Sequence, residues 1–495
     1  MRHARAPLRF PDRFYIDGCW VASSSTERFS LIDSSTEEEF AAVAAADRAD
    51  IDAAVGAARR AFDEGVWPQL TPLERAEYLR RLGEALAARA ADVAPIWTRE
   101  SGILHSLARP TVDGVAWIFS WYADLAASFP FVEKAPTLSG DLGLRVHEPV
   151  GVAACIIPWN GPIATAVFKC APALLAGCTV VLKASPEAPG TLYLLAEACE
   201  QIGLPPGVLN LVTADREVSE YLVSHPGVDK VSFTGSSAAG RRVASLCGQR
   251  MARATLELGG KSPALLLDDC DIDRAVQVIS AQAIPVTGQV CSSLTRVIVM
   301  ADHQDRVVDG LAERFRTIKV GDPFDATSEM GPLATARHRQ RVEACIAEGV
   351  AQGARLVTGG RRPPLLSRGF FVEPTLFSAV DPSMRIAREE IFGPVLCVIP
   401  VRNEAEAVAI ANDTPYGLNA SVFTEDADRA LAVARRLRSG TVGHNEFRSD
   451  FLLGMGGFKQ SGIGREGGEP GLQSFLETKS VILDGQPSLR ALSRA

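Results

Sequence analysis

The sequence predicts an α/β protein built from an open parallel sheet with helices on both faces, a second α/β domain and a small β extension. Between about residues 150 and 270, short apolar runs alternate with stretches of helical spacing. This alternation indicates parallel βαβ units whose strands are covered on both faces. A second block of the same kind begins near 260 and runs to about 455. The stretches 131–150 and 476–485 are strand-like, and exposed strands of this kind favour pairing with another subunit.

The individual elements follow from the pattern in chain order. Residues 51–64 and 73–95 show helical apolar spacing with good helix formers. The first block predicts strands over 150–160, 178–185, 208–214 and 230–236. Helices are predicted after them, over 163–176, 190–203, 215–224 and 237–248. The second block predicts strands within 261–269, 295–300, 355–359 and 393–401. This is a nucleotide-binding type of architecture, although a fold alone does not define a function.

The size and charge of the chain exclude several classes of protein. With 495 residues it is too long for one compact core, so at least two domains are expected. Its 51 Lys and Arg residues are scattered among 59 Asp and Glu residues, and the net charge of −8 argues against nucleic-acid and membrane partners. The most apolar stretch, 170–182, is too short to span a bilayer. The basic N-terminus lacks the apolar run of a secretory signal, so we expect a cytoplasmic protein.

The ten cysteines are dispersed, without a C-x-x-C pair or the spacing of a metal site. We therefore expect neither a bound metal nor a disulfide framework. A free cysteine usually behaves as a small buried hydrophobe. Cys291, in PVTGQVCSSLTR, stands between a Gly-Gln pair and two serines. Only its neighbours in space can make it a nucleophile instead.

Two motifs at predicted strand ends suit a phosphate or a ribose. FTGSSAAG, with Gly235 and Ser236, opens a helix whose free N–H groups attract a phosphate. It is neither G-x-G-x-x-G nor a P-loop, and an ordinary strand-to-helix turn explains it equally well. Lys183, in VVLKASPEAP, lies at the carboxyl end of a strand, where open α/β sheets bind ligands. Taken by itself, a solvated lysine explains it slightly better.

Three further motifs suit chemistry on a carbonyl group. Asn160, in IPWNGP, is held between two prolines, and its amide would stabilise an oxyanion unless it only forms a turn. Glu257, in LELGGKSP, lies between two leucines, where burial would raise its pKa as a general base requires. The alternative is a glutamate that faces solvent. Glu390 and Phe392, in EEIFGPVL, flank a Gly-Pro turn, and a strand with a neighbouring charge is the simpler explanation.

Taken together, the order of these motifs resembles the aldehyde dehydrogenase superfamily. The series PWN, K, FTGS, LELGGKSP, GQ-x-C, EEIFGPV and GGFKQSGIGREGG follows that family from about residue 15 to 483. The resemblance implies a Rossmann-like coenzyme domain over 1–130 and 151–258, and a catalytic domain over 259–455. It also implies an oligomerisation segment made of 131–150 and 476–495, and a homodimer or homotetramer.

The resemblance assigns the chemistry to three residues. Cys291 would attack the aldehyde to give a thiohemiacetal, and a thiol needs help to ionise at neutral pH. The Asn160 amide and the Cys291 backbone N–H would form the oxyanion hole. Hydride transfer to a nicotinamide would leave a thioester, and Glu257 would activate the water that hydrolyses it to a carboxylic acid.

The resemblance also assigns residues to the adenosine half of the coenzyme. Lys183 would bind the adenosine ribose, and Gly235 and Ser236 the pyrophosphate. Many NAD-preferring members have Glu three residues after the lysine, whereas this chain has Pro186. Such a Glu would repel a 2′-phosphate, so NAD is expected and NADP stays open. Glu187 follows directly but is expected to point elsewhere.

In the nicotinamide half, the resemblance places Trp159 beside the ring, Glu390 on the ribose and Phe392 next to it. The chain departs from the family pattern near the substrate: Val286 stands where the family has Asn five residues before the cysteine, and Pro285 replaces a frequent aromatic. Gly454, Met455, Gly456 and Gly457 replace the common Pro-Phe-Gly-Gly. These changes and HNEFRSDF at 444–451 favour a tunnel that accepts apolar or aromatic aldehydes.

Three rival functions fit the sequence less well. A coenzyme-A-acylating dehydrogenase would pass the thioester to a thiol, but such members commonly lack the base at Glu257. A cysteine hydrolase without redox chemistry would pair Cys291 with a histidine, and none of the seven histidines lies in a matched motif. A scaffold protein would not need Cys291, Glu257 and Asn160 together.

Overall fold

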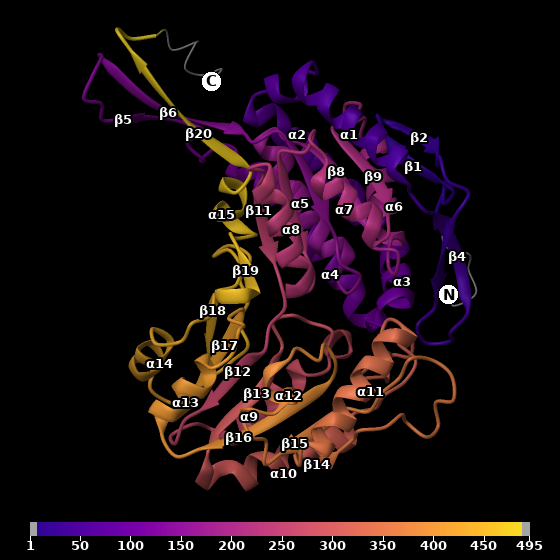
Figure 1. Ribbon diagram of the computed structural model, residues 1–495, viewed down its shortest axis with the longest axis vertical. Helices are drawn as coiled ribbons and strands as arrows, with labels where there is room; N and C mark the ends of the chain where they lie inside the picture. The colour runs from indigo at the N-terminus through magenta and orange to yellow at the C-terminus, as the bar shows by residue number, and fades with distance from the viewer. Residues whose placement is uncertain (1–6, 488–495) are drawn as a thin grey trace.

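Residues 7–487 are described by the computed structural model, which has two α/β bodies and a β extension (Figure 1). The upper body, indigo to magenta in the figure, holds most of the N-terminal half of the chain. The lower body, mostly orange, follows it. A narrow β extension projects from the upper body. The predicted fold class, α/β with two parallel-strand bodies and a small β extension, is confirmed.

The upper sheet has the order β19-β11-β10-β7-β8-β9-β1-β2 among the described residues. Its five central strands are parallel: β7 (Val152–Ile156), β8 (Thr179–Ala184), β9 (Leu209–Thr213), β10 (Lys230–Thr234) and β11 (Arg253–Glu257). Antiparallel strands complete the edges: β1 (Arg13–Ile16), β2 (Cys19–Ala22) and β19 (Gly462–Ile463). β7, β8 and β9 are buried at every position, which requires helices on both faces.

Helices cover the upper sheet on its two faces. Those that connect its parallel strands are α5 (Pro162–Ala176), α6 (Gly190–Gln201), α7 (Arg216–Ser224) and α8 (Ser237–Gln249). Those that precede them are α1 (Arg48–Asp63), α2 (Pro72–Ala88), α3 (Ala90–Ser101) and α4 (His105–Leu125). The helical stretch predicted over 73–95 is divided between α2 and α3 at Arg89, whose side chain bonds to Asp92 and Glu197. A hairpin of β3 (Arg28–Ile32) and β4 (Glu39–Ala44) lies apart from both sheets.

The lower sheet has the order β14-β15-β16-β13-β12-β17-β18 among the described residues. Its strands are β12 (Ser262–Leu266), β13 (Leu294–Met300), β14 (Arg355–Thr358), β15 (Thr375–Ser378), β16 (Val395–Val401), β17 (Asn419–Phe423) and β18 (Thr441–His444). All neighbours are parallel except β14 with β15. Its helices are α9 (Ile272–Gln282), α10 (Gln304–Thr317), α11 (Ala336–Ala351), α12 (Arg385–Arg388), α13 (Glu404–Asn412) and α14 (Ala427–Ala434).

The two sheets present opposite strand ends to each other. The chain leaves the carboxyl end of β11 at Glu257 and enters β12 at Ser262, so only residues 258–261 separate the two sheets. The upper sheet therefore offers carboxyl ends at the junction, and the lower sheet offers amino ends. Ligands of open α/β sheets bind beyond carboxyl ends, so the upper sheet is the one placed to bind a nucleotide.

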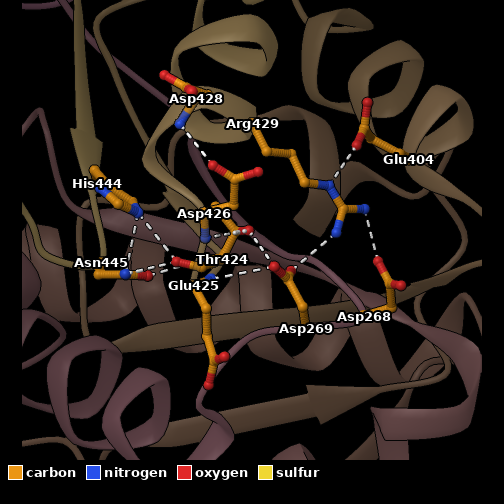
Figure 2. A network of polar contacts seen from close by, with 10 residues as sticks. All are labelled: Asp268, Asp269, Glu404, Thr424, Glu425, Asp426, Asp428, Arg429, His444 and Asn445. Atoms are coloured by element: carbon orange, nitrogen blue, oxygen red, sulfur yellow. Dashed lines mark hydrogen bonds and ion pairs between the residues drawn. The ribbon is translucent and has the colours of Figure 1, made fainter.

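Polar side chains beyond the carboxyl ends of β12 and β17 form a network of hydrogen bonds and ion pairs (Figure 2). Arg429, on α14, donates to Asp268, Asp269 and Glu404 at 2.6 to 3.0 Å. Thr424, which follows β17, donates its hydroxyl to Asp269 at 2.6 Å. These groups bond to one another, so the carboxyl ends of β12 and β17 are occupied by partners from within the protein.

The β extension is a three-stranded antiparallel sheet of order β20-β6-β5. Its strands are β5 (Val132–Ala135), β6 (Leu142–Pro149) and β20 (Leu476–Leu483), and β20 pairs with β6 along its whole length. Leu142, Leu144 and Val146 are buried on one of its faces. The predicted segments 131–150 and 476–495 thus share one sheet, except that 488–495 lie outside the described residues. A short helix, α15 (Gly468–Gln473), leads into β20. In the described part of the chain, no helix combines the length and the apolar character needed to cross a membrane.

Candidate functional site

Cys291 and Glu257 meet at the junction of the two sheets. Glu257 ends β11, and Cys291 lies in the loop that leads into β13. The Cys291 Sγ is 4.0 Å from the Glu257 Oε1. Both side chains are half-buried, and the Glu257 Oε2 has no hydrogen-bond partner among the described residues. The structure therefore brings the predicted nucleophile and the predicted base into contact.

The surroundings of this pair raise the pKa of both groups. Desolvation raises the pKa of Glu257 well above its usual value, the Glu466 carboxylate raises it further, and Lys169 opposes the shift. Desolvation also raises the pKa of Cys291, and the charges of Glu257 and Glu390 add to the effect. Because each negative charge disfavours the other, ionisation of one group raises the pKa of its partner.

Asn160 is fixed against the loop of the nucleophile. Its Nδ2 donates to the Gln289 carbonyl at 2.8 Å, and its own carbonyl accepts from the Trp97 Nε1 at 3.0 Å. An amide nitrogen carries two hydrogens, so the second N–H is left for another acceptor. Gln289 is fully buried, donates to the Ser101 carbonyl at 3.1 Å and accepts from the Ala334 N–H at 2.9 Å. The predicted oxyanion donor and the nucleophile loop are thus bound to each other.

The residues before Gln289 form a turn of left-handed backbone. Val286, Thr287 and Gly288 have φ values of 48°, 57° and 71°. Two β-branched residues in this region are strained, because their side chains crowd the following carbonyl. The Thr287 hydroxyl lies 2.9 Å from both the Gly331 and the Pro332 carbonyl oxygens. The turn presents Cys291 at the junction, and contacts with the next segment of the lower body stabilise it.

Glu390 reaches the junction from the lower body. Its Oε1 accepts from the Gly260 N–H at 3.1 Å. A Cβ atom at Gly259 would lie 2.2 Å from the Glu390 Oε2, and one at Gly260 would lie 2.3 Å from the Cys291 carbonyl oxygen. Glycine is therefore required at 260, where a Cβ atom would meet backbone, whereas at 259 it would meet only the end of a flexible side chain. Desolvation raises the pKa of Glu390 to about 7, opposed by the hydrogen bond from Gly260.

Trp159 and Phe392 face each other across the junction, with a histidine that the sequence did not indicate. The ring centroids of Trp159 and Phe392 are 5.5 Å apart, and those of His338 lie 5.2 Å from Trp159 and 5.7 Å from Phe392. The His338 Nε2 lies 2.6 Å from the Phe392 carbonyl oxygen. Burial lowers the pKa of His338 to about 4, so its ring is neutral and Nε2 carries the hydrogen that this carbonyl accepts.

A cleft of about 630 Å³ opens beside Lys183, at the carboxyl end of β8. It has an apolar wall of Ile156, Phe233, Val243 and Leu246. It has a charged rim of Lys183, Glu187, Asp215, Arg216, Glu220, Arg242 and Arg337. Desolvation lowers the pKa of Lys183 to about 8, opposed by the charges of Glu187 and Asp215. A cavity of this size, with an apolar wall and a few charged groups, suits a nucleotide.

Pro186 and Glu187 both line this cleft. The expectation that Glu187 points elsewhere is therefore wrong. Its carboxylate accepts from the Ser185 hydroxyl and bonds to the Arg337 guanidinium at 3.1 Å. Because Pro186 has no polar side chain, the carboxylate of the next residue occupies the rim instead, where the arginine of α11 holds it.

Gly235 and Ser236 lie where β10 leads into α8. The Gly235 N–H donates to the Glu257 carbonyl at 3.1 Å, which ties this turn to the catalytic strand. The Ser236 side chain caps α8 by accepting from the Ala239 N–H at 3.3 Å. The amino end of α8 thus points toward the cleft, whose lining includes Ala239, Arg242 and Val243 from the same helix. A helix start in this position attracts a phosphate.

A buried ion pair behind Glu257 was not found from the sequence. Lys169 of α5 and Glu466 form an ion pair, and Ser232 of β10 bonds to both at 3.2 Å. Lys169 is fully buried and Glu466 is 6% exposed. Both act on the pKa of Glu257, in opposite directions. Burial of a lysine within an apolar helix was the one available signal, since such a lysine needs a partner.

Aromatic side chains gather around Phe451. Phe451 stacks on Phe168 at 5.6 Å and meets Trp121 edge-on at 5.1 Å and Trp117 edge-on at 6.3 Å. Val286 packs against the same core cluster. This group, which we call the aromatic wall (Trp117, Trp121, Phe168 and Phe451), includes the last residue of the 444–451 stretch.

The described residues contain neither a group suited to a metal ion nor a disulfide. Within residues 7–487, no group of His, Cys, Asp and Glu side chains is arranged to hold a metal ion. All ten cysteines are free, and Cys19 and Cys291 are the two that are not buried.

A thiol opposite a carboxylate, next to an amide donor and a nucleotide-sized cleft, is an arrangement that suits covalent cysteine chemistry. Comparison with known proteins identifies its family. The family model described as aldehyde dehydrogenase family matches residues 20–481. The chain is 43% identical to geranial dehydrogenase of Castellaniella defragrans, over 95% of this chain and 98% of that one.

Solved structures agree with this match. Aldehyde dehydrogenase C of Pseudomonas syringae, a cysteine-to-alanine mutant in complex with NAD+ and octanal, matches with a TM-score of 0.94 and 41% identity, over 98% of this chain and 99% of that one. Mycobacterium tuberculosis aldehyde dehydrogenase complexed with NAD+ matches with a TM-score of 0.93 and 40% identity, over 95% and 98%. The chain belongs to the aldehyde dehydrogenase family. It is an oxidoreductase that oxidises an aldehyde to a carboxylic acid, as the motifs implied.

Proposed function

We propose that Cys291, Asn160 and Glu257 carry out this oxidation, and that the remaining predicted residues bind the coenzyme. The observation that supports the proposal is the 4.0 Å separation between the Cys291 Sγ and the Glu257 Oε1, two groups from different sheets. A nucleophile and a base at this separation need little movement to exchange a proton.

Catalysis begins when the Cys291 thiol passes its proton to the Glu257 carboxylate, which releases it to solvent, and the sulfur bonds to the aldehyde carbon. The carbonyl oxygen becomes an oxyanion, which the second Asn160 N–H and the Cys291 backbone N–H stabilise. The oxyanion reforms the C=O bond and expels hydride from this carbon, for which a bound nicotinamide would supply the acceptor, and a thioester on Cys291 remains. Glu257 then takes a proton from a water molecule, whose oxygen attacks the thioester carbon. The carbon–sulfur bond breaks, the acid leaves, and the Cys291 thiol is regenerated.

Glu257 suits this step because burial keeps its pKa high. A carboxylate of ordinary pKa is a weak base toward water, whereas a raised pKa makes the group a stronger proton acceptor. Lys169 and Glu466 lie behind it and balance its charge. The free Oε2 leaves one oxygen of Glu257 available to a water.

We propose NAD as the coenzyme, since the cleft beside Lys183 fits a nucleotide and two structural neighbours were solved with NAD+. When bound, its nicotinamide supplies the hydride acceptor. Lys183 would hold the adenosine ribose, and the Gly235–Ser236 turn at the start of α8 the pyrophosphate. Trp159, Glu390 and Phe392 would hold the nicotinamide end.

Glu187 supports a preference for NAD over NADP. Its carboxylate lies on the rim of the cleft and would repel a 2′-phosphate, although Pro186 removes the usual repelling group. Arg337 is paired with Glu187 and so offers less attraction to that phosphate. We expect NADP to be used with lower efficiency.

An apolar aldehyde is the proposed substrate class. Trp121, Phe168 and Phe451 of the aromatic wall pack against the same core cluster as Val286, which lies five positions before Cys291 in the chain. Leu452 and Leu453 are exposed next to Phe451, and Trp117 is 51% exposed. Apolar side chains at the surface beside a reactive site favour an apolar ligand. Two of the similar proteins are named for or bound to apolar aldehydes, geranial and octanal.

We assign the upper sheet and its helices to coenzyme binding, the lower body to catalysis, and the β extension to subunit contact in a homodimer or homotetramer. The ten free cysteines fit the proposed cytoplasmic location, because reducing compartments keep thiols reduced.

One steady-state experiment tests these proposals. Octanal and betaine aldehyde are oxidised with NAD and with NADP, by the unmodified enzyme and by Cys291→Ala and Glu257→Gln. We expect turnover of octanal with NAD, a higher kcat/KM for octanal than for betaine aldehyde, and no turnover in Cys291→Ala. Glu257→Gln should accumulate the thioester and release it slowly.

Two results would contradict the proposed roles. Full hydrolytic turnover in Glu257→Gln would remove the base assignment. Turnover that requires coenzyme A as thiol acceptor would favour the acylating alternative. A higher kcat/KM for betaine aldehyde would contradict the apolar substrate class while leaving the catalytic residues unaffected.

A further inference from the structure

Helix α11 contacts the segment that carries Glu390 and Phe392 at two backbone carbonyls. The His338 Nε2 lies 2.6 Å from the Phe392 carbonyl oxygen. One turn further along the helix, the Arg341 Nη2 donates to the Glu390 carbonyl at 2.9 Å. Residues three apart lie on the same face of a helix, so both donors reach the segment from one side.

The segment that they hold does not adopt its conformation easily. Phe392 has a φ of 62°, in the left-handed region that aromatic residues avoid. Such a conformation persists where neighbouring groups stabilise it. Two carbonyl bonds and the packing of Phe392 against Trp159 and His338 provide that stabilisation.

The helix itself is anchored so that His338 cannot turn away. Thr335 caps α11 by accepting from the His338 N–H at 3.1 Å. The His338 ring is 8% exposed and packs 5.2 Å from Trp159. The position of its Nε2–H is therefore fixed by the helix start and by the aromatic rings.

The same segment also supports the nucleophile. A Cβ atom at Gly393 would lie 2.8 Å from a methyl group of Val342, on α11. On the other side, a Cβ atom at Gly288 would lie 2.4 Å from the carbonyl carbon of Gly393. Gly393 is therefore in close contact with α11 on one side and, on the other, with the turn that precedes Cys291.

We propose that His338 and Arg341 are positioning residues for the coenzyme, which hold the Glu390–Phe392 backbone so that the Glu390 carboxylate and the Phe392 ring are in place before the coenzyme binds. This inference rests on the proposed coenzyme role of Glu390 and Phe392. Neither residue acts on the reacting atoms. Their effect is to spare the coenzyme the cost of ordering this segment.

Two measurements without turnover test the proposal. The first is hydrogen exchange of peptides that cover residues 388–395 in the coenzyme-free protein. The second is the Kd of NAD, measured by titration calorimetry. The variants are His338→Leu, which removes the donor, His338→Gln, which restores one, and Arg341→Ala, which alters an exposed side chain and leaves the core intact.

We expect His338→Leu to speed the exchange of this segment and to weaken NAD binding about three- to tenfold, as loss of one hydrogen bond does. Arg341→Ala should weaken it about threefold, and His338→Gln should recover binding to within about twofold. Arg339→Ala is the matched control, because Arg339 lies on the same helix and donates to a different carbonyl, that of Gly369. It should leave both the exchange of 388–395 and the Kd unchanged.

The proposal is overturned if His338→Leu and Arg341→Ala both leave exchange and Kd unchanged, or if His338→Gln behaves like His338→Leu. Glu390→Gln separates this outcome from failure of the proposed function. If Glu390→Gln does not weaken NAD binding, the coenzyme role of Glu390 is wrong, whereas faster exchange in His338→Leu would still establish the contact with the backbone. In that case the proposed positioning role of His338 and Arg341 is also wrong, because it depends on the coenzyme role of Glu390.

Discussion

Cys291 and Glu257 are two acids that lie within 4.0 Å of each other, and burial raises the pKa of both. The arrangement protects the thiol from oxidation at rest, because the thiolate is the reactive form. It also means that neither group is active until a proton leaves. A positive charge next to the pair would favour ionisation, and a bound nicotinamide is a cation.

The raised pKa values predict how the rate depends on pH. Both active forms are deprotonated, so kcat/KM should rise as pH increases from 6 to 9 and should not fall within that range. The measurement is a pH profile with octanal at saturating NAD. Alkylation of Cys291 by iodoacetamide should also be faster with NAD present than without it at the same pH. A flat profile from pH 6 would show that the thiol ionises more easily than its burial implies.

Individual residues could be predicted from the sequence where a short motif carries the function. Cys291, Glu257 and Asn160 lie in such motifs, and the structure brings all three to the junction. Lys169 and Glu466 could not be paired in advance, because 297 positions separate them in the chain. Nor did any motif mark His338, whose importance depends on two rings from other segments.

At the scale of the element, the left-handed turn over residues 286–288 is the least expected feature. The apolar runs predicted the buried parallel strands because burial on both faces leaves a continuous apolar signature. The turn has no such signature. Val286 and Thr287 are residue types that disfavour its backbone, so local preference argued against it, and contacts with Gly331 and Pro332 outweigh that preference.

The strain at Val286 predicts a stabilising substitution. Asn adopts left-handed backbone more readily than a β-branched residue, so Val286→Asn should raise the free energy of unfolding by about 0.5–1 kcal/mol. Urea denaturation followed by tryptophan fluorescence measures the change. Val286→Ala serves as control, since it removes the branched side chain without the local bonding of Asn, and should gain less. A lower stability of Val286→Asn than of the unmodified protein would mean that apolar packing of Val286 outweighs the strain.

At the scale of the whole molecule, the β extension stands apart from the two bodies (Figure 1). β20 and β5 form its two edges, with unpaired backbone groups along each. Ile482, on β20, is 56% exposed. Exposed edges and apolar side chains of this kind are what subunit interfaces cover.

We expect the β extension to hold subunits together in an oligomer, and we expect one substitution on β20 to weaken that association. Light scattering coupled to gel filtration should give a mass that is a multiple of 52.8 kDa for the unmodified protein. Ile482→Glu should shift the population toward smaller species, because it places a charge on the exposed strand. Leu365→Glu, at a 96% exposed position in a loop of the lower body, should leave the mass unchanged. An unaltered mass in Ile482→Glu would locate the interface elsewhere.

The short passage between the two sheets has a consequence for how this enzyme can be recombined with its relatives. Residues 258–261 join the sheets, Gly259 lies against the Glu390 carboxylate, and Gly260 fits against the Cys291 carbonyl with no room for a Cβ atom. The boundary between the two bodies therefore lies within the site that contains Glu257 and Cys291. A chimera that takes the upper body from one parent and the lower body from another should therefore keep residues 257–261, the loop that carries Cys291 and the Glu390 segment from a single parent. The two bodies have separate sheets, but the segments that meet at their junction fit together and have to be exchanged together.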